Sequence, residues 1–221
     1  WNICARLRPD EHIFGLGERF TEFDKRGQEV RMWNKDTLGC RDENAYKNIP
    51  FYLSSRGYGL FVNSVSPVEF QVGTESTASV CVHVKEESLE YYLIAGKNPK
   101  EIVQTFTNLT GPAQMPPKWS FGLWYSVGFK GTDEASVLED AEEFRRKQIP
   151  CDVFHFDCYW LRDDMWCDFV WDDSRFPHRM EMLRRLKEMN YRICLWMNPY
   201  VTVKTGMYAE GKTKGYFTKD Q

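Results

Sequence analysis

The sequence lacks a long hydrophobic run and a strong excess of either charge. No apolar segment in its 221 residues approaches the ~20 residues that cross a bilayer, and no signal peptide is visible. Basic and acidic residues nearly cancel to a net charge of -3, and no basic patch or run suggests nucleic acid or an anionic membrane. We therefore expect no membrane partner and no nucleic-acid partner. The chain begins at Trp1 rather than methionine, so we expect the native N-terminus to be missing.

Metal-binding cysteine pairs are also missing. The seven cysteines are scattered without a CxxC pair, and the four histidines lie far apart. The sequence thus predicts neither a metal site nor a cofactor. Cys81, Cys151 and Cys194 lie in apolar stretches, which is typical of small buried thiols in a reducing compartment. We therefore expect a cytoplasmic protein.

Aromatic residues are abundant instead, at 15% of the chain, and eight of them are tryptophans. Four tryptophans fall in the last third of the chain: Trp160, Trp166, Trp171 and Trp196. A hydrophobic core accounts for part of this group. Rings beside polar groups also suit a carbohydrate site, where the flat apolar faces of sugars lie on rings.

Residues 1–111 are predicted to form an all-β sandwich domain. Strands at 51–53 and 58–62 flank a four-residue loop that ends in glycine, which indicates a hairpin. Residues 68–72 and 80–84 alternate strictly between apolar and other residues, so each should have one buried and one wet face.

The end of this domain is marked by a helix and by prolines. A further strand is expected at 89–94, and a helix at 99–110 with Pro99 in its first turn. The helix is then ended, and the connection after it stiffened, by the dipeptides Gly111-Pro112 and Pro116-Pro117.

Residues 112–221 alternate between strand and helix patterns. We expect strands at 120–125, 152–156 and 192–197, and helices at 132–147 and 178–190. This alternation indicates a parallel sheet with right-handed crossovers. A (β/α)8 TIM barrel needs eight such units and ~250 residues, so the pattern predicts about its first three strands, in a longer protein.

The start of the helix at 132–147 has acidic residues but no strict capping box. Ala135 stands three residues after Thr132, where a capping box needs glutamate or glutamine. Asp133 and Glu134 still suit a helix N-terminus, because acidic groups are stabilised by the helix dipole there.

The strand at 152–156 has an apolar run without the alternating polar positions of a solvent-exposed face, which suits a strand buried on both sides. It is followed at once by Asp157, Cys158 and Tyr159. Parallel α/β folds place their ligands at the carboxyl ends of such strands. The alternative for Asp157 is a carboxylate that caps a helix or lies in a loop.

Six motifs together resemble glycoside hydrolase family 31, most closely its α-xylosidase branch. They are FGLGERF (14–20), AYKNIPFY (45–52), PKWSFGLW (117–124), FHFDCYW (154–160), WCDF (166–169) and CLWMNPY (194–200). The resemblance implies an N-terminal β-sandwich followed by a (β/α)8 barrel. It also implies a retaining α-glycosidase with two catalytic aspartates ~5–5.5 Å apart, one a nucleophile and the other an acid/base.

No catalytic residue is assigned to this chain. In the family both aspartates come from later barrel strands. The family's Lys-Thr-Asp nucleophile motif has no match, because Lys204-Thr205 is followed by Gly206. The resemblance implies that this chain supplies part of the sugar-binding wall and is inactive alone.

Asp157, Cys158 and Tyr159 match family residues around the sugar that is cleaved. Asp157 matches an aspartate that binds sugar hydroxyls, and a carboxylate can accept two such charge-assisted bonds. The α-glucosidase branch has Ile-Asp where this chain has Cys158-Tyr159, and a ring there would crowd a hydroxymethyl group and favour xylose. The most similar α-xylosidases carry phenylalanine at this position, and the Tyr159 hydroxyl could bind water or a sugar hydroxyl.

Trp196, Trp166, Phe129 and Asp36 match further substrate-binding residues of the family. The resemblance places Trp196 and Trp166 in the pocket, Phe129 near the leaving group, and Asp36 on a loop that reaches from the sandwich over the active site. A core tryptophan stays open as the alternative for Trp196, and a loop residue folded onto its own barrel for Phe129.

The leading hypothesis is release of α-linked xylose from the non-reducing ends of xylosides or xyloglucan oligosaccharides. The second is an α-glucosidase, α-galactosidase or transglycosidase of the same family. The third is a piece that at most binds sugar. The expected partner is a carbohydrate substrate, and because relatives often assemble, a homo-oligomer stays open.

Overall fold

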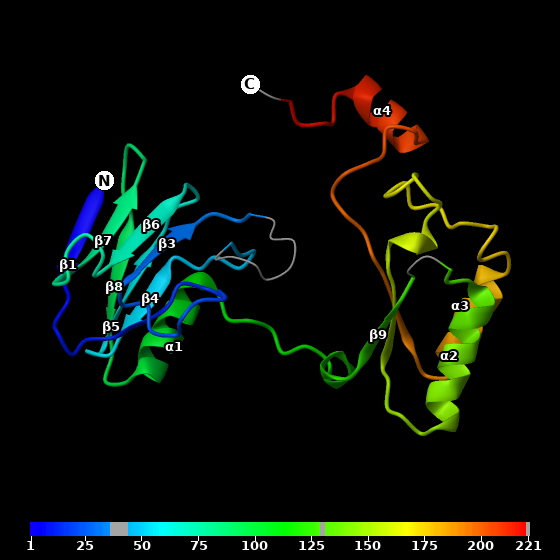
Figure 1. Cartoon of the computed structure of the whole chain (residues 1–221), viewed down its shortest axis with the longest axis horizontal. Helices are drawn as coiled ribbons and strands as arrows, with labels where there is room; N and C mark the ends of the chain where they lie inside the picture. Colours follow the sequence, from blue (N-terminus) through cyan, green and yellow to red (C-terminus); the bar gives the residue numbers. More distant parts are fainter. Residues whose placement is uncertain (36–43, 129–130, 220–221) are drawn as a thin grey trace. The chain divides into compact units, whose positions relative to one another are not determined.

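The computed structural model describes residues 1–35, 44–128 and 131–219 (Figure 1). They form two compact units, Trp1–Gln114 and Met115–Gln221. Within the described residues, no helix is both long enough and apolar enough to span a bilayer. Nor do three His, Cys, Asp or Glu side chains of that part gather where they could hold a metal ion.

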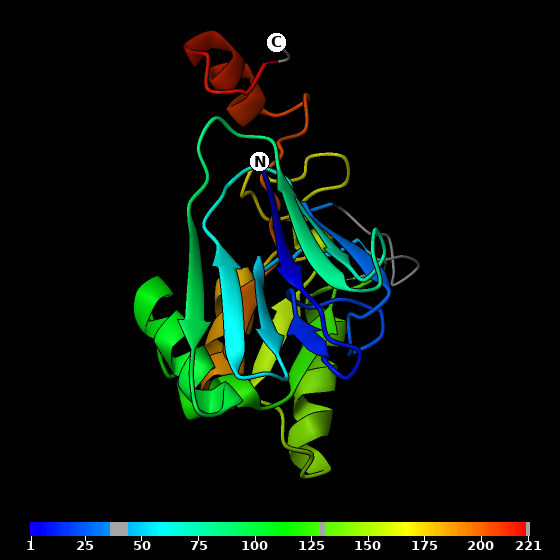
Figure 2. The ribbon, with the colours of Figure 1, turned by 90° about the vertical axis from the view of Figure 1, so that its left-hand side faces the viewer.

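The first unit contains two antiparallel sheets of four strands each, whose strands run roughly vertically in Figure 2. The first sheet has the order β1-β7-β6-β3, with β1 (Asn2–Arg6), β3 (Gln28–Met32), β6 (Val68–Val72) and β7 (Ser79–Val84). The second has the order β2-β4-β5-β8, with β2 (Ile13–Gly15), β4 (Phe51–Ser54), β5 (Tyr58–Val62) and β8 (Tyr91–Ala95). The predicted sandwich and its β4–β5 hairpin are confirmed. The hydrophobic pattern did not predict β1 or β3.

The main core of this unit draws on both sheets, with Tyr52 and Leu60 from the second and Val30 and Phe70 from the first. The prediction of strict alternation on β6 and β7 is wrong in part, because Gln71 and Cys81 are buried as well. Gln71 donates to Glu69 and accepts a hydrogen bond from Thr74, which satisfies its buried amide.

Helix α1 (Pro99–Thr110) covers the second sheet, so that sheet is apolar on both faces. Asn98 caps the helix by accepting a hydrogen bond from the Glu101 backbone. Gly59 on β5 makes this packing possible. A Cβ atom there would lie 2.7 Å from the Phe51 ring and 2.9 Å from Ile102, closer than side chains pack.

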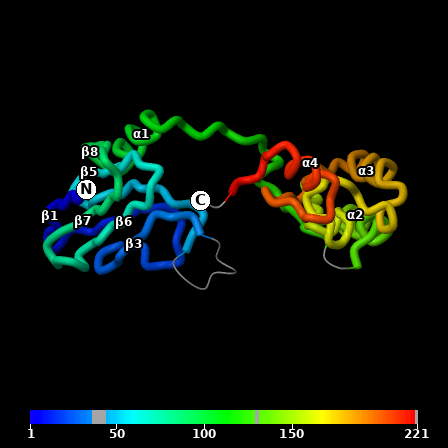
Figure 3. The backbone as a smooth tube through the Cα atoms, turned by 90° about the horizontal axis from the view of Figure 1, so that it is seen from above, coloured from blue at the N-terminus to red at the C-terminus, as the bar shows by residue number. Residues whose placement is uncertain are grey.

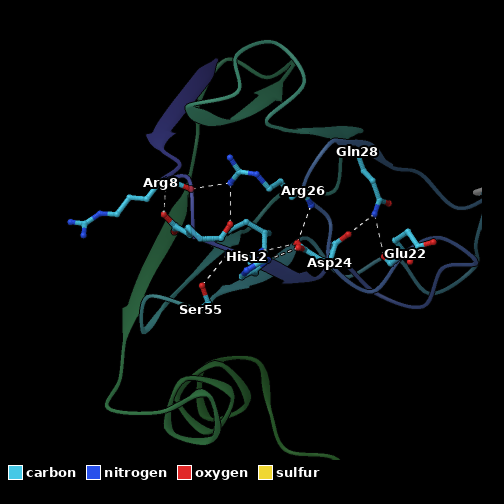
Figure 4. Close-up of polar contacts among 9 residues, drawn as sticks. Arg8, His12, Glu22, Asp24, Arg26, Gln28 and Ser55 are labelled. Atoms are coloured by element: carbon cyan, nitrogen blue, oxygen red, sulfur yellow. Dashed lines mark hydrogen bonds and ion pairs between the residues drawn. The ribbon is translucent and has the colours of Figure 1, made fainter.

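A polar cluster around Asp24 organises the loop from β2 to β3 (Figure 4). One carboxylate oxygen contacts His12 Nδ1 at 2.6 Å, and the other accepts from the backbone of Arg26 at 3.1 Å. Gln28 Nε2 donates to the Asp24 carbonyl at 2.7 Å. Burial would raise the pKa of Asp24, but the bonds from His12 and the backbone outweigh it and lower that pKa.

The expectation that Cys81 is a free thiol is wrong, because the structure joins it to Cys4 in a disulfide. The two residues face each other in the register of β1 and β7, which places their side chains on the same face of the sheet. Cys151 is a buried free thiol, as expected, while Cys194 is free and half-buried.

The second unit has a parallel sheet of three strands in the order β11-β10-β9. The strands are β9 (Trp124–Val127), β10 (Val153–Phe156) and β11 (Arg192–Leu195). The helices are α2 (Glu134–Arg146), α3 (Arg179–Glu188) and α4 (Gly206–Lys214), with short 3-10 turns η1 (Lys118–Phe121) and η2 (Cys158–Trp160). Helices α2 and α3 lie side by side in this unit (Figure 3). The three predicted barrel strands and their parallel pairing are confirmed.

Two local predictions for this unit are wrong. The strand expected at 120–125 begins at Trp124 instead, because Ser120 bonds back to the Pro117 carbonyl through both its amide and its hydroxyl and closes η1. Helix α2 does have a capping box, which uses Asp133 as N-cap and Ser136 three residues later. A serine hydroxyl thus takes the place of the glutamate that the expected pattern requires.

Strand β10 lies at the centre of the second core. Phe154 and Phe156 are fully buried, and Phe154 packs edge-on against Tyr191 at 4.7 Å between ring centroids. Tyr191 ties α2 to this core, since its hydroxyl donates to the Ala141 carbonyl at 2.8 Å and Arg145 lies 3.6 Å over its ring. A rigid scaffold of this kind holds the ends of the strands in place.

Candidate functional site

The carboxyl ends of the three parallel strands meet at one edge of the sheet. Phe156 is paired with Val127 of β9 and with Leu195 of β11. The ladder continues for one residue, because the Asp157 amide donates to Val127 at 2.6 Å and the Trp196 amide donates to Phe156 at 2.8 Å. Asp157 and Trp196 therefore stand on the same edge, as the sequence predicted for a ligand site.

Gly128 allows β9 and β10 to stay close beyond their last pairs. Its φ is +110°, and a Cβ atom there would lie 2.8 Å from the Asp157 amide nitrogen. A larger residue would push Asp157 away from the edge, so the glycine is required by the position of the carboxylate.

Asp157 is half-buried and caps η2, because its Oδ1 accepts from the Cys158 amide at 2.6 Å. The capping alternative for this residue is therefore correct as a description of its local structure. A carboxylate has about four lone-pair positions, so one cap bond leaves room for other donors. Capping and ligand binding do not exclude each other here.

The Cys158 thiol is held in its neutral form. Burial and the neighbouring Asp157 carboxylate together raise the pKa of Cys158 to about 11. At neutral pH the side chain is thus a neutral thiol. A thiolate nucleophile is disfavoured at this position, since nucleophilic cysteines have lowered pKa values.

Three aromatic rings contact one another in a row and form an aromatic wall, and its first member, Tyr159, follows Asp157 by two residues. Tyr159 meets Trp166 edge-on with 6.4 Å between centroids, and Trp166 meets Trp196 at 6.0 Å. The Trp160 indole donates to the Trp196 carbonyl at 2.9 Å and so fixes the end of β11. Among the described residues, the buried indole nitrogen of Trp166 has no hydrogen-bond partner.

Of the four tryptophans, only Trp160 belongs to the buried core, at 3% exposed. Trp171 is half-buried and packs against Trp160 at 5.2 Å between centroids. Trp166 and Trp196 are half-buried and lie against the core with one side. The alternative of a core tryptophan is thus correct for the side of Trp196 that packs against the core.

Sequence reasoning missed Arg175, whose guanidinium lies 5.4 Å from the centre of the Tyr159 ring. The signal was present as Asp172 three residues before Arg175, a spacing that forms an ion pair at 2.9 Å. Burial would raise the pKa of Asp172, but bonds from Ser174 and Arg175 outweigh it and lower that pKa.

Two predicted residues, Asp36 and Phe129, lie outside the described residues, so their placement stays a prediction. A groove of about 820 Å³ lies elsewhere, along α2 and the 174–177 segment. The charged side chains that line this groove form ion pairs with one another, as Glu142 does with Arg185. This charged lining differs from the aromatic wall.

Both parts of the chain match family models. Residues 113–221 match the glycosyl hydrolases family 31 TIM-barrel domain. Residues 3–71 match the glycosyl hydrolase 31 N-terminal galactose mutarotase-like domain. The matched parts correspond to the second unit and to most strands of the first.

Individual proteins are similar over nearly the whole chain. The α-xylosidase XylQ of Lactiplantibacillus pentosus is 46% identical over 94% of this chain and 27% of its own length. An α-xylosidase of Emericella nidulans is 46% identical over 96% of this chain and 27% of its own length. A solved GH31 dextranase of Flavobacterium johnsoniae, complexed with glucose, is 32% identical with a TM-score of 0.91, over 99% of this chain and 27% of that one. The chain thus spans about a quarter of the length of these relatives.

Proposed function

Because the chain belongs to glycoside hydrolase family 31, we propose that it forms part of a retaining α-glycosidase that releases α-linked xylose from non-reducing ends. In this proposal the chain supplies one wall of the pocket for the sugar that is cleaved. The catalytic aspartates would come from later barrel strands, since Lys204-Thr205 is followed by Gly206 in this chain and Thr205 caps α4.

The observation that carries the xylose proposal is the position of the Tyr159 ring. It follows Asp157 by two residues, meets the Trp166 ring at near right angles and contacts the Arg175 guanidinium. In this proposal the ring reaches the sugar and leaves little room for a hydroxymethyl group. Xylose lacks that group, and the 46% identity to two α-xylosidases supports the same preference.

The sugar would bind by two kinds of contact. Asp157 would accept hydrogen bonds from sugar hydroxyls, with charge assistance. Trp166 and Trp196 would pack against the apolar face of the ring, and the Trp166 indole would supply a donor once a ligand reaches it.

The test is hydrolysis of p-nitrophenyl α-xyloside and p-nitrophenyl α-glucoside by the full-length protein. A higher kcat/KM for the xyloside is expected, and a clear glucoside preference would refute the xylose assignment. Replacing Tyr159→Asp should move the ratio toward the glucoside by on the order of tenfold, the discrimination one small group provides in a pocket. Tyr159→Phe is the matched control and should leave the xyloside preference in place.

A second candidate is an enzyme that acts on α-glucosides or transfers sugars to acceptors. It is favoured by the likeness to the dextranase complexed with glucose and by the Tyr159 hydroxyl, which could bond to a sugar. Product analysis at high acceptor concentration separates the two, because transfer yields new oligosaccharides and hydrolysis yields only the free sugar.

A further inference from the structure

An ion pair between Asp172 and Arg175 helps to hold the loop between β10 and α3 together. Asp172 accepts from the Ser174 amide at 2.9 Å and from its hydroxyl at 2.6 Å through Oδ1. Its Oδ2 accepts from Arg175 Nε at 2.9 Å. The two side chains are 15% and 20% exposed, so water competes little with the pair. A carboxylate held at three points gives the guanidinium a fixed anchor.

The other end of the guanidinium is fixed as well. Arg175 Nη2 donates to the Leu161 carbonyl at 2.7 Å. Leu161 follows η2 directly and forms a bridge with Trp171, so this bond ties the loop to the turn that carries Tyr159. A planar guanidinium with a hydrogen bond at each end cannot rotate freely. A lysine ammonium lacks this planar fork and could not reproduce the arrangement.

The Tyr159 ring lies against this fixed group. The guanidinium carbon is 5.4 Å from the ring centroid, within the range of a cation–π contact. The edge-on contact with Trp166 restrains the ring from a second direction. Because the cation is one of the two contacts that restrain the ring, removing it would let Tyr159 move to another rotamer.

We propose that the Asp172–Arg175 pair is a positioning element that sets sugar selectivity by holding the Tyr159 ring in place. Arg175 acts through Tyr159 and not by touching the sugar. This inference rests on the proposed function, because Tyr159 is taken there as the group that excludes a hydroxymethyl substituent. Without Arg175 the ring is free to yield, and a larger sugar gains access.

The test compares Arg175→Met with the unchanged full-length protein on p-nitrophenyl α-xyloside and α-glucoside. The ratio of the two kcat/KM values is expected to fall about three- to tenfold, mainly because KM for the glucoside decreases, a change of the size a cation–π contact allows. Arg175→Lys keeps the charge but loses the planar fork of the guanidinium. Its ratio of kcat/KM values should therefore lie between those of the unchanged protein and Arg175→Met. Arg179→Met is the matched control, since Arg179 pairs with exposed Asp173 and should leave the ratio unchanged.

A merely structural role would lower kcat/KM on both substrates by the same factor, and that result would overturn the proposal. The second readout is a double-mutant cycle. With Tyr159→Ala in place, Arg175→Met should no longer change the ratio, and an undiminished change would also overturn it. If Arg175→Met does not fold, Arg175→Lys carries the same comparison.

Failure of the proposed function can be told apart from failure of this inference. A glucoside preference of the unchanged protein would refute the xylose assignment, yet the dependence of the Arg175 effect on Tyr159 would still be measured. Without turnover, the Kd values of xylose and glucose from tryptophan fluorescence give the same ratio and the same cycle. An Arg175 effect that does not depend on Tyr159 in that assay refutes the inference alone.

Discussion

Replacement of Asp157 gives a prediction whose size can be worked out from the contacts of its carboxylate. The Cys158 amide uses about one of the four lone-pair positions. Two of the remaining positions can accept sugar hydroxyls. A hydrogen bond to a charged group contributes about 1.5–3 kcal/mol, so two such bonds contribute about 3–6 kcal/mol.

Asp157→Ala should therefore lower kcat/KM by roughly 10²- to 10⁴-fold, at 1.4 kcal/mol for each factor of ten. Asp157→Asn keeps one acceptor oxygen and the cap bond but loses the charge, which makes each bond about half as strong. Its expected loss is about 1.5–3 kcal/mol, or roughly 10- to 150-fold. Loss of the cap in Asp157→Ala lowers stability by about 1 kcal/mol, which leaves the protein folded.

The assay is steady-state hydrolysis by the full-length protein, with urea unfolding of each variant as the measure of stability. Asp163→Asn is the matched control, because Asp163 is an exposed carboxylate in the same loop. Folded Asp157 variants whose kcat/KM stays within about twofold of the parent would show that the carboxylate is only a cap, because loss of even one charged bond predicts tenfold or more. Such a result would refute the assignment of Asp157 to the sugar.

Three further predictions concern stability. Gly59→Ala should lower the free energy of unfolding by about 1–3 kcal/mol in thermal melts, because the added carbon overpacks the contact with α1, while Gly206→Ala, in open space, should not. Reduction of the Cys4–Cys81 bond, whose residues are 77 apart, should lower the free energy of unfolding by about 4.5 kcal/mol in the chain-entropy description. Peptide mapping with blocked thiols checks the bond, and finding it in protein from the native source would count against the cytoplasmic prediction. The lowered pKa of Asp172 stabilises the folded protein at pH values above the unfolded pKa of about 3.9. This stability is lost as the pH falls through the folded pKa. Asp172→Asn should therefore flatten the acid limb of a curve of stability against pH, and an unchanged limb would contradict this.

Local patterns were enough to predict most elements. The apolar run at β10, the helical spacing of α2 and α3, and the proline in the first turn of α1 each depend on neighbours within a few residues. The parallel order of the three strands also followed, because strand–helix–strand units close with one handedness. Asp157 and Trp196 could be placed on one edge for the same reason.

Local errors arose where side chains compete with the pattern. Ser136 completes the capping box through a hydroxyl that the glutamate rule overlooks, and Ser120 bonds back to Pro117 and delays β9. Gln71 is buried although it is polar, since its amide finds partners on its own strand and turn. These bonds depend on geometry that residue type alone does not specify.

By itself, then, the sequence determined the order of the elements, the family motifs and the edge at which Asp157 stands. Only the tertiary structure decided that Cys4 pairs with Cys81 and that Arg175 lies against the Tyr159 ring. The physical reason is range, because periodicity and capping act over a few residues. Contacts between residues 16 or 77 positions apart arise only when the sheet register and the loop path bring them together.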